Sequence, residues 1–161
     1  MKIVLLLKMV PDVVEELELA ADGKALDTEF LRMIPDERDN HALEQALLLK
    51  EKFGGTVTVV SLDAPEVDDA LFTALAKGAD RAVKVLDGDG VLGTCAGAHR
   101  LAQVLASVPG LLPADLILTG AQAIDDLDGL TSALVAQQLH LPQLGIVTQV
   151  SVDPSGGVAT V

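Results

Sequence analysis

Hydrophobic residues along this chain alternate between short continuous runs and stretches with helical spacing. The runs are rich in Val, Ile and Leu, which is typical of strands buried on both faces of a parallel sheet. They predict strands at residues 2–9, 56–62, 81–86, 115–119 and 145–152. Between the runs, apolar positions recur every three or four residues. This spacing predicts helices at about 36–53, 65–77, 93–108 and 129–140.

The regular alternation of strand and helix indicates an α/β fold, an open parallel sheet with helices on both faces. With right-handed crossovers, we expect the strand order 3-2-1-4-5. Ligands of such folds bind outside the carboxyl ends of the strands, where the strand order reverses. We therefore expect the segments after Lys8 and after Thr119 to face each other across a crevice. Their main-chain amides should converge on a ligand there.

The two irregular parts of the chain lie at 11–35 and at the C-terminus. Residues 11–35 contain a Gly23 turn, and an extended piece is expected near 30–34. Residues 1–150 are expected to form a single α/β domain. Residues 151–161 are typical of an incomplete C-terminal hairpin, because a Pro/Gly turn separates two short extended runs. An open edge of this kind favours a partner, or a homo-oligomer formed through the edge.

Composition narrows the classes of function. The chain has 161 residues, a net charge of −13, and only 2% aromatic residues. This acidity argues against nucleic acid as a partner. No apolar run approaches the roughly 20 residues that span a membrane, so we expect no membrane insertion and a cytoplasmic location. The one cysteine, Cys95, fits a reducing compartment and is expected to be a buried, unreactive thiol.

Candidate binding chemistry lies in residues 119–131, between the fourth strand and the fourth helix. Small residues there allow close backbone approach, and the helix start offers free N–H groups to a phosphate. Thr131 adds a hydroxyl. The nearby Asp125, Asp126 and Asp128 favour capping of this helix over contact with a ligand. Lys8 is either the nearest cation for a phosphate or a solvated lysine at a strand end.

Catalytic patterns are not found in the sequence. The three histidines fall on different predicted helices without metal-ligand spacing, and His140 is expected at a helix C-terminus. Neither a Ser–His or Cys–His arrangement nor a glycine-rich phosphate motif can be argued from the residues. We therefore expect a binding protein and not an enzyme.

Several stretches, taken together and in order, resemble the β subunit of electron-transfer flavoproteins, the FixA-type family. They are residues 2–11, 42–52, 57–61, 74–81, 115–120, 122–126 and 139–143. The most specific are Ala-Lys-Gly-Ala-Asp-Arg at 76–81 and Gly-Ala-Gln-Ala-Ile-Asp at 120–125. The chain is shorter than typical members of that family.

The resemblance implies an adenine-nucleotide α-hydrolase-like fold and the role of an electron carrier. The partner it implies is the electron-transfer flavoprotein α subunit, in a heterodimer that collects electrons from dehydrogenases. The implied cofactor of the β subunit is AMP or FAD. In such a carrier the flavin performs the redox chemistry, and the polypeptide supplies position and electrostatics.

The resemblance also implies a set of cofactor-binding residues. These are Leu6, Lys8, Asp36, Leu62, Gly120, Gln122, Ala123, Ile124, Asp125, Gly129, Thr131 and Ser132. Four positions depart from the family pattern, in which Asn, Lys, Gln and Gly are usual. The residues found here are Asp36, Ala121, Leu130 and Ser132, and all four changes weaken an expected phosphate site.

Other functions remain open at the level of sequence. The first is a nucleotide-sensing or stress-type regulatory homodimer on the same fold, and the second is a degenerate relative with a structural role. A small hydrolase or ligase is a third class, against which the missing glycine-rich phosphate loop argues.

Overall fold

The computed structural model describes residues 1–24, 26–27, 31–86, 92–153 and 158–160. Its centre is a four-stranded parallel sheet in the order β5-β4-β1-β6. These strands are β1 (Lys2–Leu7), β4 (Thr56–Leu62), β5 (Arg81–Val85) and β6 (Leu116–Thr119). The order 3-2-1-4 predicted for the first four strands is thereby confirmed.

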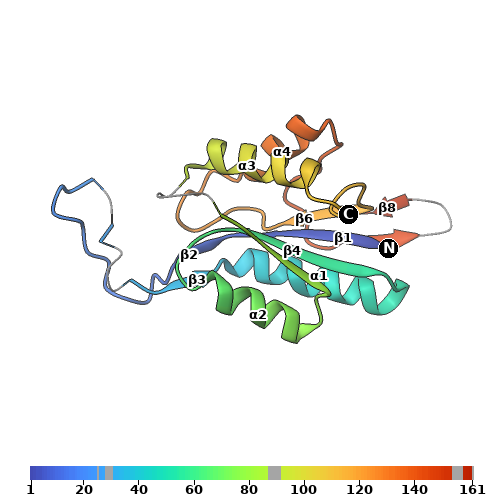
Figure 1. The fold of residues 1–161 in the computed structure, drawn as a ribbon, viewed down its shortest axis with the longest axis horizontal. Helices are drawn as coiled ribbons and strands as arrows, with labels where there is room; N and C mark the ends of the chain where they lie inside the picture. The colour runs from blue at the N-terminus through green and yellow to red at the C-terminus, as the bar shows by residue number, and fades with distance from the viewer. Residues whose placement is uncertain (25, 28–30, 87–91, 154–157, 161) are drawn as a thin grey trace.

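Helices cover both faces of the sheet (Figure 1). They are α1 (Glu37–Phe53), α2 (Val67–Lys77), α3 (Thr94–Ser107) and α4 (Thr131–Leu139). The first two lie on one face, and the last two lie on the opposite face. The predicted helices and the α/β fold class are therefore confirmed, with helix ends within about two residues of those expected from periodicity.

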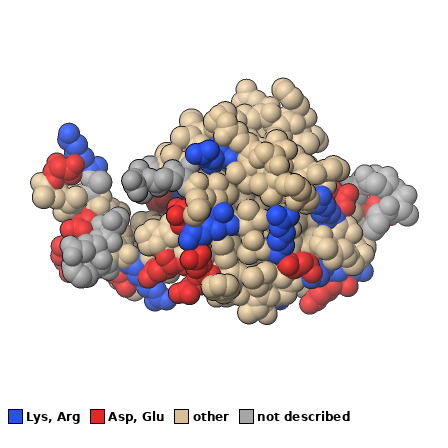
Figure 2. Space-filling model, in the orientation of Figure 1, with Lys and Arg blue, Asp and Glu red and all other residues tan. Residues whose placement is uncertain are grey.

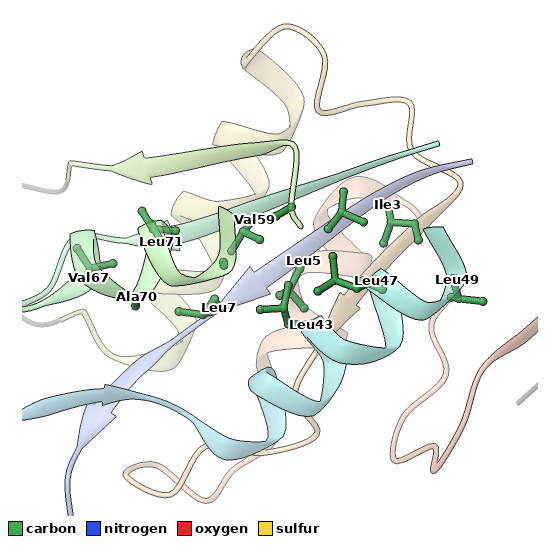
Figure 3. Packing of buried hydrophobic residues seen from close by; sticks show 14 of the residues in the cluster. Ile3, Leu5, Leu7, Leu43, Leu47, Leu49, Val59, Val67, Ala70 and Leu71 are labelled. Atoms are coloured by element: carbon green, nitrogen blue, oxygen red, sulfur yellow. The ribbon is translucent and has the colours of Figure 1, made fainter. Parts of the chain in front are cut away.

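Strand β1 supplies side chains to two separate hydrophobic cores. Ile3, Leu5 and Leu7 pack toward α1 and α2, as Figure 3 shows. Val4 and Leu6 pack on the other side of the sheet, against residues of α3 and α4. All five side chains are buried. The continuous apolar run at the N-terminus is thus explained by burial on both faces, as parallel strands require.

Helix ends follow local sequence signals. The Asp36 carboxylate caps α1 by accepting the N–H of Arg38 (2.9 Å). Gly54 and Gly78 end α1 and α2 with φ of 71° and 123°, a region that favours glycine because it has no Cβ. His140 occupies the C-cap of α4, as predicted.

A long segment that follows β1 in the chain projects from the body of the molecule, on the side away from the marked N-terminus (Figure 1). Its base is an antiparallel pair formed by β2 (Met9–Pro11) and β3 (Met33–Pro35). The extended piece expected near 30–34 corresponds to β3. The pair joins the end of β1 to the start of α1, so it stands beside the carboxyl edge of the sheet.

The C-terminal part departs from the prediction. Ser151–Asp153 (β7) pairs with Val158–Thr160 (β8) in antiparallel fashion, as expected for a hairpin, while its turn lies outside the described residues. The expected fifth parallel strand at 145–152 is wrong, because the described residues form no such strand beside β6. Ile146 is 88% exposed, and the main chain of Val150 accepts a hydrogen bond from Gln45 of α1. Strand propensity depends on packing against a neighbour, and this run has none in the sheet.

Candidate functional site

A cavity of about 770 Å³ lies at the carboxyl ends of the parallel strands. Its walls come from the ends of β1, β4 and β6, the start of α3, and the segment that leads into α4. This is where the strand order reverses, and ligands of open parallel sheets bind at such points. The volume falls in the range of small-molecule sites, about 300–1,000 Å³. The predicted crevice is therefore present.

Of the cofactor-binding residues implied by the family resemblance, only Ile124 does not line this cavity. Its main-chain N–H instead donates to Asp36 (3.2 Å), which ties the loop after β6 to the start of α1. Arg38 strengthens this tie by donating to the main-chain oxygen of Gln122 (3.1 Å). The fold thus brings the other implied residues together, and their role in holding a ligand stays a prediction.

Asp39 is a central residue of the site that our sequence analysis missed. Its carboxylate accepts the main-chain N–H of Lys8 (2.7 Å) and that of Gly120, which follow β1 and β6. We expected these amides to face a ligand, and this expectation is wrong, because a carboxylate of the chain itself binds both. Asp39 lies four residues before Leu43, on the buried face of α1, and this placement is the signal that could have revealed it.

The burial of Asp39 changes its acidity. The side chain is almost fully buried, and loss of hydration raises its pKa to about 7. The nearby charge of Asp36 acts in the same direction. The two main-chain N–H donors and the ammonium of Lys8 favour the carboxylate form, but they offset only part of the effect of burial.

Gly120 permits the close contact between β6 and α1. A Cβ atom at this position would lie 2.6 Å from Oδ1 of Asp39 and 2.9 Å from its main-chain nitrogen. Real Cβ atoms do not approach other heavy atoms so closely, and the main-chain nitrogen cannot move aside easily. Glycine is therefore required here by packing against Asp39.

Lys8 forms ion pairs inside the cavity. Its Nζ atom lies 2.6 Å from a carboxylate oxygen of Asp125 and 2.6 Å from one of Asp126. Partial burial works to lower the pKa of Lys8, but the hydrogen bonds and charges of the two carboxylates raise it above its ordinary value. The side chain of Lys8 is 38% exposed, in part as expected for a solvated lysine, but its ammonium is paired with two carboxylates. The capping prediction for Asp125 and Asp126 is wrong, because the adjacent ends of β1 and β6 bring them to Lys8.

The start of α4 carries no side-chain cap. Asp128 accepts the N–H of Leu130 (2.9 Å), which is the cap residue, so its contact lies just outside the helix. Thr131 and Ser132, the first two residues of α4, line the cavity. Polar groups at this helix start thus face the space that a ligand would occupy.

The rest of the lining is apolar and acidic. Apolar side chains at the wall include Leu6, Leu7, Met9, Leu26, Leu31, Met33, Leu62, Pro65, Leu92 and Leu101. Six aspartates also line it: Asp36, Asp39, Asp63, Asp125, Asp126 and Asp128. Within the described part of the chain, Lys8 is the one basic residue among them. The lining carries far more acidic than basic groups.

The outer surface and remaining candidate groups are less specific. Figure 2 shows acidic and basic side chains interspersed on one face, without an extended basic patch among the residues described there.

Cys95 is exposed in the first turn of α3, so the prediction of a buried thiol is wrong; the packed part of that helix begins at Gly97. The described residues hold no cluster of His, Cys, Asp and Glu suited to a metal ion. None of the described helices is long and apolar enough to cross a bilayer.

Comparison with known proteins gives consistent matches. Residues 26–161 match the family model for the electron transfer flavoprotein domain. The chain is 38% identical over 154 residues to "Electron transfer flavoprotein subunit beta" of Clostridium acetobutylicum, covering 95% of this chain. It is 34% identical over 165 residues to the protein of that name from Mycobacterium leprae, covering 98% of this chain. "Protein FixA" of Azotobacter vinelandii is 39% identical over 116 residues, which cover 70% of this chain and 40% of that protein.

The first two relatives are longer than this chain. The aligned regions span 58% of the Clostridium acetobutylicum protein and 60% of the Mycobacterium leprae protein. The similarity therefore concerns about three fifths of each relative.

Proposed function

The chain belongs to the electron transfer flavoprotein domain family, and we propose on this basis that it is a β-like subunit of an electron carrier. In this proposal it pairs with an α subunit, and the pair receives electrons from dehydrogenases in the cytoplasm. The observation that carries the proposal is the family match across residues 26–161, which include most of the cavity lining. The chain itself acts as a carrier subunit and not as an enzyme.

The cofactor implied for the cavity is AMP or FAD, and the residues present fit its two halves differently. The apolar walls and the volume of about 770 Å³ suit an adenine ring and a ribose. The phosphate does not fit, because the carboxylates of Asp125 and Asp126 already neutralise Lys8. In addition, Asp39 already binds the amides that follow β1 and β6.

Exposed apolar side chains support a partner surface. Leu144, Ile146 and Val147, which follow α4, have exposed fractions of 68%, 88% and 41%. Grouped apolar residues on a surface are typical of protein interaction sites. These residues follow α4 in the chain and are not among the residues that line the cavity.

Co-expression with an electron transfer flavoprotein α subunit tests the proposal. We expect a one-to-one complex on size-exclusion chromatography, with a flavin spectrum that a cognate dehydrogenase reduces. The Ile146→Asp variant should weaken the complex, whereas Glu44→Gln on the exposed side of α1 should not. A stable homodimer with no affinity for the α subunit would contradict the proposal and favour the regulatory alternative.

A further inference from the structure

We propose that the cavity selects an uncharged nucleoside, and that each phosphate added to that nucleoside weakens binding. This inference deepens the proposed function, since it concerns the ligand of the same cavity and rests on that assignment. It differs from the family's implied ligand in one respect, the fate of the phosphate. Most polar groups that line the cavity already have partners within the chain, and these partners disfavour a phosphate.

The cation of the cavity is already neutralised. Lys8 Nζ is 2.6 Å from oxygens of both Asp125 and Asp126, so two negative charges surround one positive charge. A phosphate approaching Lys8 would meet this excess negative charge. It would also have to displace at least one short charge-assisted hydrogen bond, and such bonds are among the stronger ones in proteins. Lys8 therefore does not provide a free anion-binding site.

The main-chain donors near the strand ends are also occupied. The N–H groups of Lys8 and Gly120 both donate to the Asp39 carboxylate. The N–H of Ile124 donates to Asp36. The two amides at the strand ends thus hold an aspartate of the chain itself, as does the amide of Ile124 outside the lining, and both aspartates add negative charge at the cavity.

The other acidic groups also have internal partners, so they do not call for a cationic ligand. Asp63 pairs with Lys84 (3.2 Å), and Asp128 accepts the N–H of Leu130. The groups that remain for a ligand are apolar walls, the hydroxyls of Thr131 and Ser132, and the start of α4, which carries no side-chain cap. The partial positive charge of a helix start is about half a unit, which is small beside the six aspartates of the lining. A flat, neutral ring with a sugar hydroxyl matches this combination better than an anion or a cation.

Calorimetry on the full chain tests the proposal with adenosine, AMP and ADP as probes near neutral pH. We expect adenosine to bind, AMP to bind at least about tenfold more weakly, and ADP to bind more weakly still, since like charges repel strongly where solvent is partly excluded. Equal or tighter binding of AMP would overturn the proposal. Failure of all three probes would also overturn it.

Variants identify the cause of the selection. In Asp125→Asn/Asp126→Asn, Lys8 loses both carboxylates, so AMP should bind about tenfold more tightly than it binds the wild type, while adenosine changes less than about twofold. The single Asp125→Asn variant is milder, because Lys8 is the side-chain partner that Asp125 loses among the described contacts, and Asp126 still pairs with Lys8. It should shift AMP in the same direction by about threefold. An unchanged ratio of AMP to adenosine affinity in both variants would overturn the proposal.

A matched control removes the same number of charges elsewhere. Glu44→Gln/Glu51→Gln changes two exposed residues of α1 that do not line the cavity, so it should leave the affinity ratio unchanged. A shift in this control as large as in the aspartate variants would mean that net charge alone sets the preference, which would also overturn the proposal. Complex formation with the α subunit is measured separately, so loss of the ligand preference and loss of the proposed carrier role give different results.

Discussion

Asp39 makes a specific prediction about stability and pH. The folded protein raises the pKa of this carboxyl from 3.8 to about 7, chiefly because the group is buried. Between these values the folded state holds a proton that the unfolded chain releases. The free energy of unfolding must therefore fall as pH rises through this window. At about 1.4 kcal/mol per pKa unit, the loss from Asp39 is on the order of 4 kcal/mol across about pH 4 to 7.

Asp39→Asn removes this titration and keeps the size of the side chain. One of the two main-chain N–H groups would lose an ideal acceptor, which costs about 1–3 kcal/mol for a buried donor. We expect the variant to be less stable than the wild type near pH 5 and to lose less stability as pH rises. The difference in unfolding free energy between the two proteins should thus change by roughly 2–3 kcal/mol between about pH 5 and pH 8.

Urea denaturation followed by far-ultraviolet circular dichroism gives the measurement, because the chain has no Trp or Tyr to serve as a fluorescent probe. Taking the difference between wild type and variant at each pH cancels every other titrating group. Parallel stability curves from about pH 5 to pH 8 would refute the reasoning, since they would mean that burial of Asp39 does not oppose its ionisation.

Three further predictions concern stability. Gly120→Ala should lower the free energy of unfolding, measured by urea denaturation, by about 1–3 kcal/mol, because the new Cβ meets main-chain atoms of α1. The control Gly93→Ala should not show this clash, because no atom lies within 4 Å of the added Cβ. Leu105→Ala should lower the free energy of unfolding by about 2–5 kcal/mol, since the side chain is fully buried in the core under α3; a smaller loss would indicate that the core closes over the gap. The hydrogen bond from Lys50 is the main cause that lowers the pKa of Asp80. The stability that this contact contributes should therefore persist above about pH 4, and it should vanish as pH falls through the pKa of Asp80 in the folded protein. Asp80→Asn should flatten that acid limb of the thermal stability curve only slightly, because the group is well exposed, and an unchanged acid limb would contradict the assignment.

The fold was largely predictable because each correct element carries a local signal. β1 is an almost continuous aliphatic run, β4 is rich in β-branched residues, and α1 combines a capping aspartate, an apolar face and a terminal glycine. The failed strand at 145–152 shows the limit of such signals. Its residues favour extended backbone, but a strand in a sheet also needs a neighbour with free hydrogen-bonding groups, and this pairing is not encoded in the run itself.

The site was predictable in position but not in its polar contacts. Strand order alone places the ends of β1 and β6 together, and the family resemblance indicates which residues surround them. The partners of Lys8 could have been inferred from the same topology, because Asp125 and Asp126 follow the neighbouring strand. Asp39 was overlooked because a charged residue near a helix start is usually solvated, and only its position on the buried face of α1 indicated otherwise.

The aliphatic character of both sides of β1 has a consequence for how the sheet is assembled. If this strand slid by one residue against β4, the two cores would exchange their interior side chains, Val, Leu and Ile in each case, but Lys2 or Lys8 would take the place of Ile3 or Leu7. The interior of the strand therefore discriminates weakly between the correct pairing and its nearest competitor, whereas the lysines at its ends oppose the slide. Carboxylates at the two ends of the strand also favour the correct pairing over the shifted one. Asp115 accepts the N–H of Lys2 (2.7 Å), and Asp39 accepts the N–H of Lys8. Polar contacts at its two ends, and not the bulk of its interior, specify which alignment this strand adopts.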